Sequence, residues 1–474
     1  MIETGITESL VANALGKNSL LLRATFDAEG QLVWSALKSD GSRIWIAASC
    51  SGCPNDLLTL REATAKHDFR VRLAWIQATG QRCELRKQLQ LVLNALQQDA
   101  HLSSQALLDL LNHIHGFLQQ PEFEHIHKLW LLCCNRLWQP PQQPETYATW
   151  ADHAVQRLRI FLNYVTVKPR LPNTLLEEAT ADYISEVAAL WNLDALHAML
   201  RPDIDVIVQV DDALHAAPIP YLPVGGQPLF QQIRSVRSTY SVLLNILQQA
   251  AAQGFQPSTS NAERMLVVSW FDDASTGDNV TIAKELHQGQ RDLASQYDLD
   301  YYGAADDPPG SIGVISAALG AYRSFKVVTI SGHGDHLEAG VKLQDDALWK
   351  GNGCDLSQVE LLLLVSCSIG RATQTGDLDV EGFCVQLAVH RALSVMACRW
   401  PISGRESATF AKEIVNQYLE LCNQVPNKDD TVECLRARAL NAARKAFYTE
   451  SIDRIIGKSI GLNTAAAFEL YGLG

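Results

Sequence analysis

Short apolar runs alternate with longer amphipathic segments from about residue 203 onward. Runs such as 326–331 (KVVTIS) and 361–366 (LLLLVS) are mostly apolar, and the segments between the runs repeat their apolar residues with a helical period. Strands without a polar face are typical of a parallel sheet that helices cover on both faces. The pattern therefore predicts an α/β fold with a mostly parallel sheet flanked by helices. We expect its strands at 206–210, 265–270, 326–331, 361–366 and 393–398.

The first part of the chain has a different pattern of apolar and polar residues. Three runs within 19–49, rich in Leu, Val, Ile and Trp, are separated by the Gly-containing stretches AEGQ and DGSR, which predicts a small antiparallel β-meander. From about residue 84 the apolar residues recur with a helical period, which predicts amphipathic helices. We therefore expect an N-terminal region at 1–175, with the meander at about 19–60 and a helical segment at about 84–170, followed by a second domain at 176–474.

Composition and charge exclude several classes of protein. The chain has 474 residues, of which 47% are apolar and 19% charged, as expected for a soluble globular protein with a large core. Its 39 Lys and Arg residues against 52 Asp and Glu residues give a net charge of −13, so we expect neither nucleic acid nor a membrane surface as a partner. The longest aliphatic run, 361–365, is far shorter than the roughly 20 residues of a membrane span. The first residues lack the pattern of a secretory signal, and the 11 cysteines are irregularly spaced, so we expect a reducing, cytoplasmic location.

Two successive predicted strands end in residues that carry chemistry. The run 326–331 leads into Gly332-His333-Gly334, and the run 361–366 leads into Cys367. If these strands are neighbours, their carboxyl ends lie about 5 Å apart at one edge of the sheet, so His333 and Cys367 come within reach of each other. An imidazole beside a thiol can take its proton and produce a nucleophilic thiolate, and the backbone N–H groups of Gly334 and Cys367 can form an oxyanion hole. The alternative is structural, because a cysteine at a strand end is most often a small core residue and a lone Ser-Gly-His-Gly stretch is most often a turn.

These residues lie within a longer series of motifs. In chain order the series reads VIVQVDDALHAAPIPYLPVGGQPL, VVTISGHGDH, GVKLQDDALWK, VELLLLVSCSIG, SVMACRWPISGRESATFAKEIVNQYL, ALNAARKAFY and NTAAAFELYGLG. It resembles the CHAT family of caspase-like cysteine peptidases over about 180–474, and more weakly over the meander at 19–50. The resemblance implies a caspase-type α/β sandwich that hydrolyses peptide bonds, with His333 and Cys367 as its catalytic dyad. Ser368 stands where the family usually has a charged residue, so the resemblance does not carry over a cleavage specificity.

Further residues near these motifs are candidates for substrate binding. Asp377, Asp379 and Glu381 follow the second strand and can line a pocket for a Lys or Arg side chain, since a desolvated carboxylate strongly prefers a cationic partner. The alternative for them is a solvated acidic loop that opens the next helix. Arg399 and Trp400 follow the next predicted strand and are expected to line the same cleft, with a buried structural role as the alternative for Trp400.

We expect no metal ion and no other cofactor. Cys50 and Cys53 have the spacing of half a zinc site, but no second close pair follows at the required distance. The leading hypothesis is a cysteine endopeptidase that cleaves specific protein substrates and is gated by a protein activator or by an upstream protease. The family resemblance implies a bacterial setting such as antiviral defence or programmed cell death, including association with CRISPR. Two alternatives stay open: a catalytically silent scaffold for protein–protein interaction, and a thiol hydrolase or acyltransferase that acts on a small molecule.

Overall fold

The chain forms two compact units in the computed structural model. The first combines Met1–Leu60 with Ile184–Gly474, and the second is Arg61–Tyr183. The structure describes residues 15, 18–47, 55–78, 109, 112–116, 118–119, 130–131, 172–210, 212–239, 264–269, 277–303, 312–321, 324–335, 340–343, 348–351, 354–368, 370, 372–374, 380–389, 391–402, 404–424, 434–452 and 460–472.

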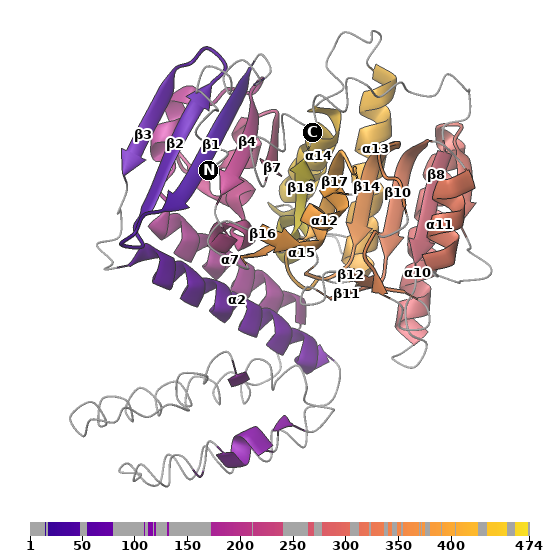
Figure 1. Ribbon diagram of the computed structural model, residues 1–474, viewed down its shortest axis with the longest axis horizontal. Helices are drawn as coiled ribbons and strands as arrows, with labels where there is room; N and C mark the ends of the chain where they lie inside the picture. The colour runs from indigo at the N-terminus through magenta and orange to yellow at the C-terminus, as the bar shows by residue number, and fades with distance from the viewer. Residues whose placement is uncertain are drawn as a thin grey trace. The chain divides into compact units, whose positions relative to one another are not determined.

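One large sheet dominates the first unit (Figure 1). Its eleven strands among the described residues are, in spatial order, β3 (Arg43–Ala47), β2 (Leu32–Lys38), β1 (Ser19–Phe26), β4 (Asp205–Val210), β7 (Ser235–Thr239), β18 (Phe468–Gly472), β17 (Ser394–Cys398), β14 (Val359–Val365), β10 (Phe325–Ser331), β8 (Arg264–Ser269) and β9 (Asp300–Gly303). The block β9, β8, β10, β14 and β17 is parallel throughout. β18 is antiparallel to β17 but parallel to β7, and β4 and β1 continue this second parallel block. The predicted α/β fold with a mostly parallel sheet is therefore confirmed.

The other elements of the described residues are helices and short strands. The helices are α2 (Asp56–Ala78), α7 (Pro172–Leu190), η4 (Asp194–Met199), η5 (Asp212–Ala216), η6 (Ile219–Tyr221), α8 (Leu229–Gln232), α10 (Gly277–Gln296), α11 (Ile312–Ala321), α12 (Phe383–Val389), α13 (Gly404–Gln424), α14 (Leu435–Ile452) and α15 (Leu462–Ala467). The short strands are β5 (Pro223–Val224), β6 (Gln227–Pro228), β11 (His333–Asp335), β12 (Gly340–Lys342), β13 (Leu348–Trp349), β15 (Ala372–Gln374) and β16 (Val380–Gly382). β11, β12 and β13 form a small antiparallel sheet, and β15 pairs with β16.

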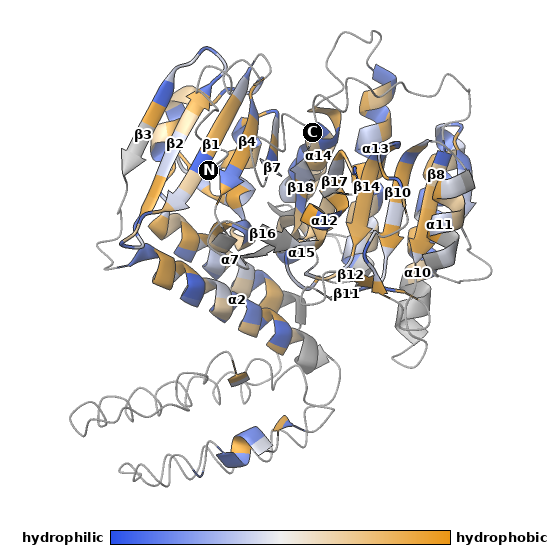
Figure 2. Cartoon of the chain, viewed as in Figure 1, coloured by the Kyte–Doolittle hydropathy of each residue, from blue (hydrophilic) through white to orange (hydrophobic). Residues whose placement is uncertain are grey.

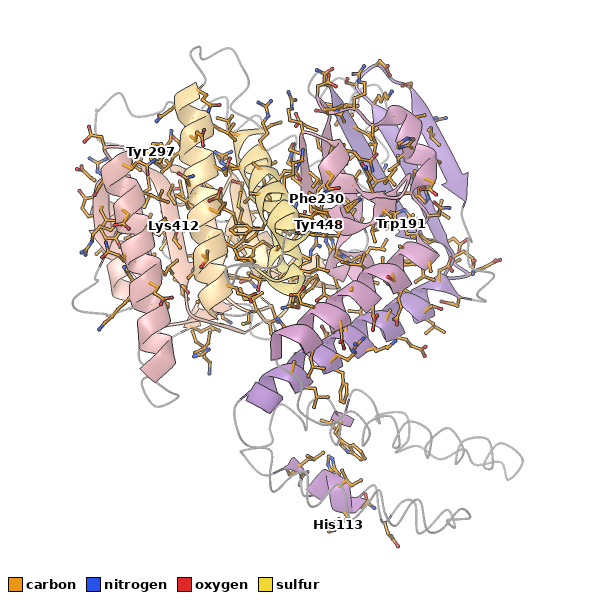
Figure 3. All side chains as sticks on the ribbon, turned by 180° about the vertical axis from the view of Figure 1, so that it is seen from behind. His113, Trp191, Phe230, Tyr297, Lys412 and Tyr448 are labelled. Atoms are coloured by element: carbon orange, nitrogen blue, oxygen red, sulfur yellow. The ribbon has the colours of Figure 1, made fainter. Side chains whose placement is uncertain are left out.

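Helices cover both faces of the first parallel block. On one face, Ile315 of α11 and Leu387 of α12 belong to one hydrophobic cluster with residues of β8, β10, β14 and β17. On the other face lie α10 and α13, and α14 continues this layer over β18 and β7; Figure 3 marks the three helices by Tyr297 (directly after α10), Lys412 and Tyr448. Figure 2 shows the strands between these layers as mostly hydrophobic. Burial on both faces is the reason that these strands lack a polar face.

The predicted β-meander is confirmed, and it belongs to the large sheet. β1, β2 and β3 pair antiparallel in chain order, and β1 also pairs in parallel with β4, where Leu22 lies opposite Val208. The Asp56 carboxylate accepts a hydrogen bond from the Leu32 N–H at 3.0 Å, which ties the start of α2 to the meander. This strand pairing joins the meander to the residues after 184, so the compact units divide the chain differently from the expected boundary between 175 and 176.

The sequence pattern did not predict the helices α2 and α7. Within the second unit, the His67 ring stacks on the Tyr183 ring with centroids 4.6 Å apart, and Arg70 forms an ion pair with Asp182. The apolar contacts between α2 and α7 come from Val71, Ala74, Leu176 and Ala179. Most of the expected helical segment at 84–170 lies outside the described residues. Among the described helices, none combines the length and the hydrophobicity that crossing a membrane requires.

Candidate active site

The carboxyl ends of β10 and β14 lie side by side. The two strands pair in parallel, with Ser331 opposite Val365, and neighbouring strands are about 4.8 Å apart. His333 is the second residue after Ser331, and Cys367 is the second residue after Val365. Both therefore stand at the same distance along the chain beyond the paired strand ends, at the edge where β11 and β12 lie in Figure 1. The predicted adjacency of the two strands is confirmed.

Two buried serines tie these strand ends together. The Ser331 hydroxyl donates a hydrogen bond to the Val365 carbonyl at 3.0 Å. The Gly332 N–H donates to the Ser366 hydroxyl at 3.2 Å, so the turn before His333 is bonded to the residue before Cys367. Neither serine was among the residues predicted to form the site. Their signal is a hydroxyl residue at the end of each of two mostly apolar runs.

The candidate dyad differs in exposure from the cysteines around it. His333 is exposed and Cys367 is partly exposed. Cys384 of α12 and Cys398 of β17, the strand beside β14, are both buried. Burial, followed by the neighbouring Cys367 sulfur, raises the pKa of the Cys398 thiol well above its ordinary value. Cys398 therefore stays protonated at neutral pH, whereas solvent can reach Cys367.

The turn after Cys367 has a special backbone conformation. Ser368 is buried with a φ of 59°, in the left-handed region that residues with a Cβ atom seldom adopt. Two residues later, the Gly370 N–H donates to the Cys398 carbonyl at 2.8 Å. A Cβ at position 370 would lie 3.1 Å from that carbonyl, so glycine permits this close approach. The chain therefore turns sharply at the end of β14 and packs against the end of β17.

Gly332 serves the fold as well as the site. A Cβ at this position would lie 2.5 Å from the Lys342 carbonyl, so only glycine allows β12 to approach the end of β10 so closely. In the small sheet, His333 lies opposite Lys342 and Gly334 lies opposite Val341, with β11 at the edge of the three strands. The packing of β12 supplies a sufficient structural reason for a glycine at position 332.

The side chains of Arg399 and Trp400 are buried. Arg399 is 1% exposed and forms an ion pair with Glu469 of β18 at 2.8 Å. Trp400 is 0% exposed, and its indole N–H donates to the Asn463 carbonyl at 3.0 Å. Both residues follow β17 at the edge that carries the candidate dyad, but their side chains face the interior. Their burial favours the structural role that was the alternative for Trp400, and it extends that role to Arg399.

The acidic candidates fall in a segment that is only partly described. Glu381 lies in β16, where its backbone pairs with Thr373 of β15. Asp377 and Asp379 lie outside the described residues. The acidic substrate pocket therefore stays a prediction.

A polar cluster at the end of β8 escaped the sequence analysis. Ser269 lies opposite Ser331, and its hydroxyl is 2.6 Å from Nε2 of His287 on α10. The other ring nitrogen of His287 is 2.8 Å from the Tyr301 hydroxyl. Burial, with the charge of Arg291 as a second cause, lowers the pKa of His287 to about 4, so the ring is neutral at pH 7. A neutral imidazole between two hydroxyls ties the end of β8 to α10 and to β9.

The described residues contain no group of three or more His, Cys, Asp or Glu side chains placed to hold a metal ion. The polar residues gathered at the strand ends are instead hydroxyl, imidazole and thiol groups, which suit proton transfer and nucleophilic attack.

The order of these motifs along the chain has a counterpart in a known family. The family model described as CHAT domain matches residues 178–456, which is more than half of the chain. The chain belongs to the CHAT domain family. The family resemblance drawn from the sequence is thus confirmed, and the matched CHAT domain includes His333, Cys367 and the strands that precede them.

Two solved structures resemble the chain at low identity. The separase–securin complex of Saccharomyces cerevisiae contains a chain that is 12% identical with a TM-score of 0.47, and the match covers 98% of this chain and 31% of that chain. The Arg-specific cysteine proteinase gingipain R is 13% identical with a TM-score of 0.36, and the match covers 62% of this chain and 68% of that chain. This chain therefore spans about 31% of the length of its match in the separase complex. No curated protein sequence matches the chain.

Proposed function

We propose that this CHAT domain protein is a caspase-like cysteine endopeptidase with His333 and Cys367 as its catalytic dyad. The observation that carries the proposal is the register of β10 and β14, in which both residues stand two positions beyond a paired strand end. The bonds of Ser331 and Ser366 support it, because they hold the two chain segments in one arrangement. The exposure of His333 and the partial exposure of Cys367 support it as well, since a nucleophile and its base must meet a substrate.

The proposed mechanism uses the chain's own groups throughout. The imidazole of His333 takes the Cys367 proton, and the thiolate attacks the carbonyl carbon of the scissile peptide bond. The N–H groups of Gly334 and Cys367 stabilise the negative charge on the carbonyl oxygen. When the intermediate collapses, the C–N bond breaks and the imidazolium gives its proton to the leaving amine. A water molecule, deprotonated by His333, then attacks the thioester and releases the carboxylate product and the thiol.

The proposal includes selectivity and control. The substrates are specific proteins, and the acidic residues Asp377, Asp379 and Glu381 favour a Lys or Arg side chain before the cleaved bond. A protein activator or an upstream protease switches the enzyme on, because an unrestrained endopeptidase would damage the cell that makes it. A role in bacterial antiviral defence or cell death, including association with CRISPR, rests on the family resemblance.

The proposal is tested with a peptide library prepared from a digested proteome. Wild-type protein is incubated with the library, and new peptide ends are identified by mass spectrometry. We expect the wild type to cleave at a basal rate even before it is switched on, and this basal cleavage to fall more than about 1,000-fold in Cys367→Ala and His333→Ala, because each variant lacks one half of the dyad.

Cys422→Ala is the matched control, because Cys422 is also a partly exposed cysteine outside any disulfide but lies on α13. It should cleave as the wild type does. Cleavage that survives in Cys367→Ala contradicts the proposal. Hydrolysis of small thioesters by the wild type without any peptide products would instead favour a small-molecule thiol hydrolase.

A further inference from the structure

The turn that follows Cys367 is bonded to two neighbouring strands through a single glycine. The Gly370 N–H donates to the Cys398 carbonyl at the end of β17, at 2.8 Å. The Gly370 carbonyl accepts a hydrogen bond from the Tyr471 hydroxyl of β18, at 2.7 Å. Both backbone polar groups of Gly370 therefore hold the turn. The N–H donates to the backbone of β17, and the carbonyl accepts from a side chain of β18.

The local backbone depends on this support. Ser368 is held in the left-handed region, which is unfavourable for a residue with a Cβ atom, and such a conformation persists only where the surrounding structure fixes it. Gly370 is buried, so water could not replace the Tyr471 hydroxyl as the hydrogen-bond donor to the Gly370 carbonyl if that hydroxyl were removed. The turn would then relax, and Cys367 at its start would move with it.

Tyr471 is well suited to act as a permanent donor. It is buried in β18 and lies opposite Val395 of β17, so the strand pairing sets its position. Burial raises the pKa of Tyr471, although the charge and hydrogen bond of Arg399 oppose the effect, so the hydroxyl keeps its proton at every working pH. Arg399 is itself fixed by its ion pair with Glu469. A connected series of buried groups thus leads from Glu469 through Arg399 and Tyr471 to the turn that carries Cys367.

We infer that Tyr471 is a positioning residue for Cys367. The inference rests on the proposed function, in which Cys367 is the nucleophile, and it adds β18 to the elements that build the site. By holding the Gly370 carbonyl, Tyr471 keeps the turn in the one conformation that presents the Cys367 thiol at the strand edge beside His333. Arg399, whose burial the sequence did not predict, contributes to the same positioning, because it forms a hydrogen bond with Tyr471.

The test compares Tyr471→Phe with Tyr418→Phe in the full chain. Tyr418 is also buried, and its hydroxyl donates to the Glu360 carboxylate at 2.8 Å, near the amino end of the strand that Cys367 follows. Each variant loses one buried hydroxyl together with the hydrogen bond that this hydroxyl donates. The first measurement is the rate at which iodoacetamide labels Cys367 between pH 5 and 9, followed on its own peptide by mass spectrometry. The second is hydrogen exchange of the peptide that spans 366–374.

We expect Tyr471→Phe to lower the labelling rate at pH 7 about tenfold, to shift the labelling profile to higher pH, and to speed exchange in the turn, because one buried hydrogen bond is worth roughly one pKa unit. Tyr418→Phe should leave both measurements within about twofold of the wild type, since it acts at the other end of β14. A folded Tyr471→Phe variant that labels and exchanges as the wild type does overturns the inference. An equal loss in Tyr418→Phe also overturns it, because the effect would then be general.

A second variant keeps the inference testable if Tyr471→Phe does not fold. Gly370→Ala leaves Tyr471 in place but would bring a Cβ to 3.1 Å from the Cys398 carbonyl, which should displace the turn and slow the labelling of Cys367. Wild-type labelling in this variant overturns the inference. The two proposals can also fail separately. Labelling of wild-type Cys367 that is no faster than that of Cys422 contradicts the proposed function. Faster hydrogen exchange in the turn of Tyr471→Phe would still support the role of Tyr471 in holding the turn.

Discussion

The two ends of the β10–β14 pair are fixed in different ways. At the amino ends, Lys326 and Glu360 form an ion pair of 2.9 Å, and the Tyr418 hydroxyl donates to the same carboxylate. At the carboxyl ends, Ser331 and Ser366 make neutral hydrogen bonds between the strands. A fixed charge beside a reacting thiol and imidazole would shift the pKa values of both. The comparison teaches that one strand pair can join its strands by charge at one end and by neutral hydrogen bonds at the end that carries the residues proposed to react.

The largest expected effect that tests this contrast is on stability alone. Glu360→Ala removes the partner of Lys326 and of the Tyr418 hydroxyl, and we expect it to lower the free energy of unfolding by about 3 kcal/mol. Peptide cleavage at 25 °C should stay within about twofold of the wild type, because the change lies at the far end of the strand. Urea denaturation and the cleavage assay measure the two quantities. Glu420→Ala, which changes an exposed glutamate of α13, is the control and should lower stability by less than about 0.5 kcal/mol.

The next largest expected effect is a loss of stability at low pH that arises from His287, which contacts the end of β8. Burial lowers the folded-state pKa of His287 to about 4, below the roughly 6.5 of an unfolded histidine, so the unfolded chain binds the proton first as the pH falls. Stability from this group is complete above about pH 6.5 and decreases as the pH falls towards 4. Between pH 7 and pH 5 we expect the loss to be about 2 kcal/mol.

His287→Gln should remove this part of the pH dependence, as measured by urea denaturation at the two pH values. Tyr301→Phe removes a hydrogen bond but keeps His287 buried, so it should retain the dependence. If Tyr301→Phe abolishes the dependence as well, the hydrogen bond and not burial is the cause.

The smallest effect on stability is expected at the carboxyl ends. Ser331→Ala removes one neutral hydrogen bond to the Val365 carbonyl and should cost about 1 kcal/mol. Because the bond aligns the segments that carry His333 and Cys367, we expect kcat/KM for a cleaved peptide to fall about tenfold. Ser407→Ala removes a comparable bond to the Gly404 carbonyl at the start of α13, and it should leave kcat/KM unchanged. Equal activity in the two variants would contradict the role of Ser331 in alignment.

The sequence predicted the elements whose burial pattern is simple. β10 and β14 bury mainly apolar residues on both faces, and residues that follow parallel strands gather at one edge, so His333 and Cys367 could be placed together. α2 was not predicted because its buried positions include His67 and Asp68, which a hydrophobic pattern counts as surface.

Other parts of the site depend on contacts that no local pattern contains. β18 carries a charged residue, Glu469, at a buried position, and its partners Arg399 and Arg444 come from elsewhere in the chain. The same holds for Tyr471 and Gly370, which are far apart in sequence and meet through one hydrogen bond. Such pairs are decided by the tertiary structure, so the sequence could propose the dyad but not what holds it.

The place of β18 in the sheet has a consequence for the timing of assembly. β18 follows every other described strand in chain order, yet it lies between β7 and β17 and joins the two parallel blocks. During synthesis the residues of all the other described strands are made before those of β18, so the facing edges of β7 and β17 can pair with β18 only at the last step. Tyr471 reaches the turn after Cys367 only when β18 is inserted. A nascent chain therefore carries His333 and Cys367 for a time before the proposed site can be complete, and the order of translation sets when it is completed.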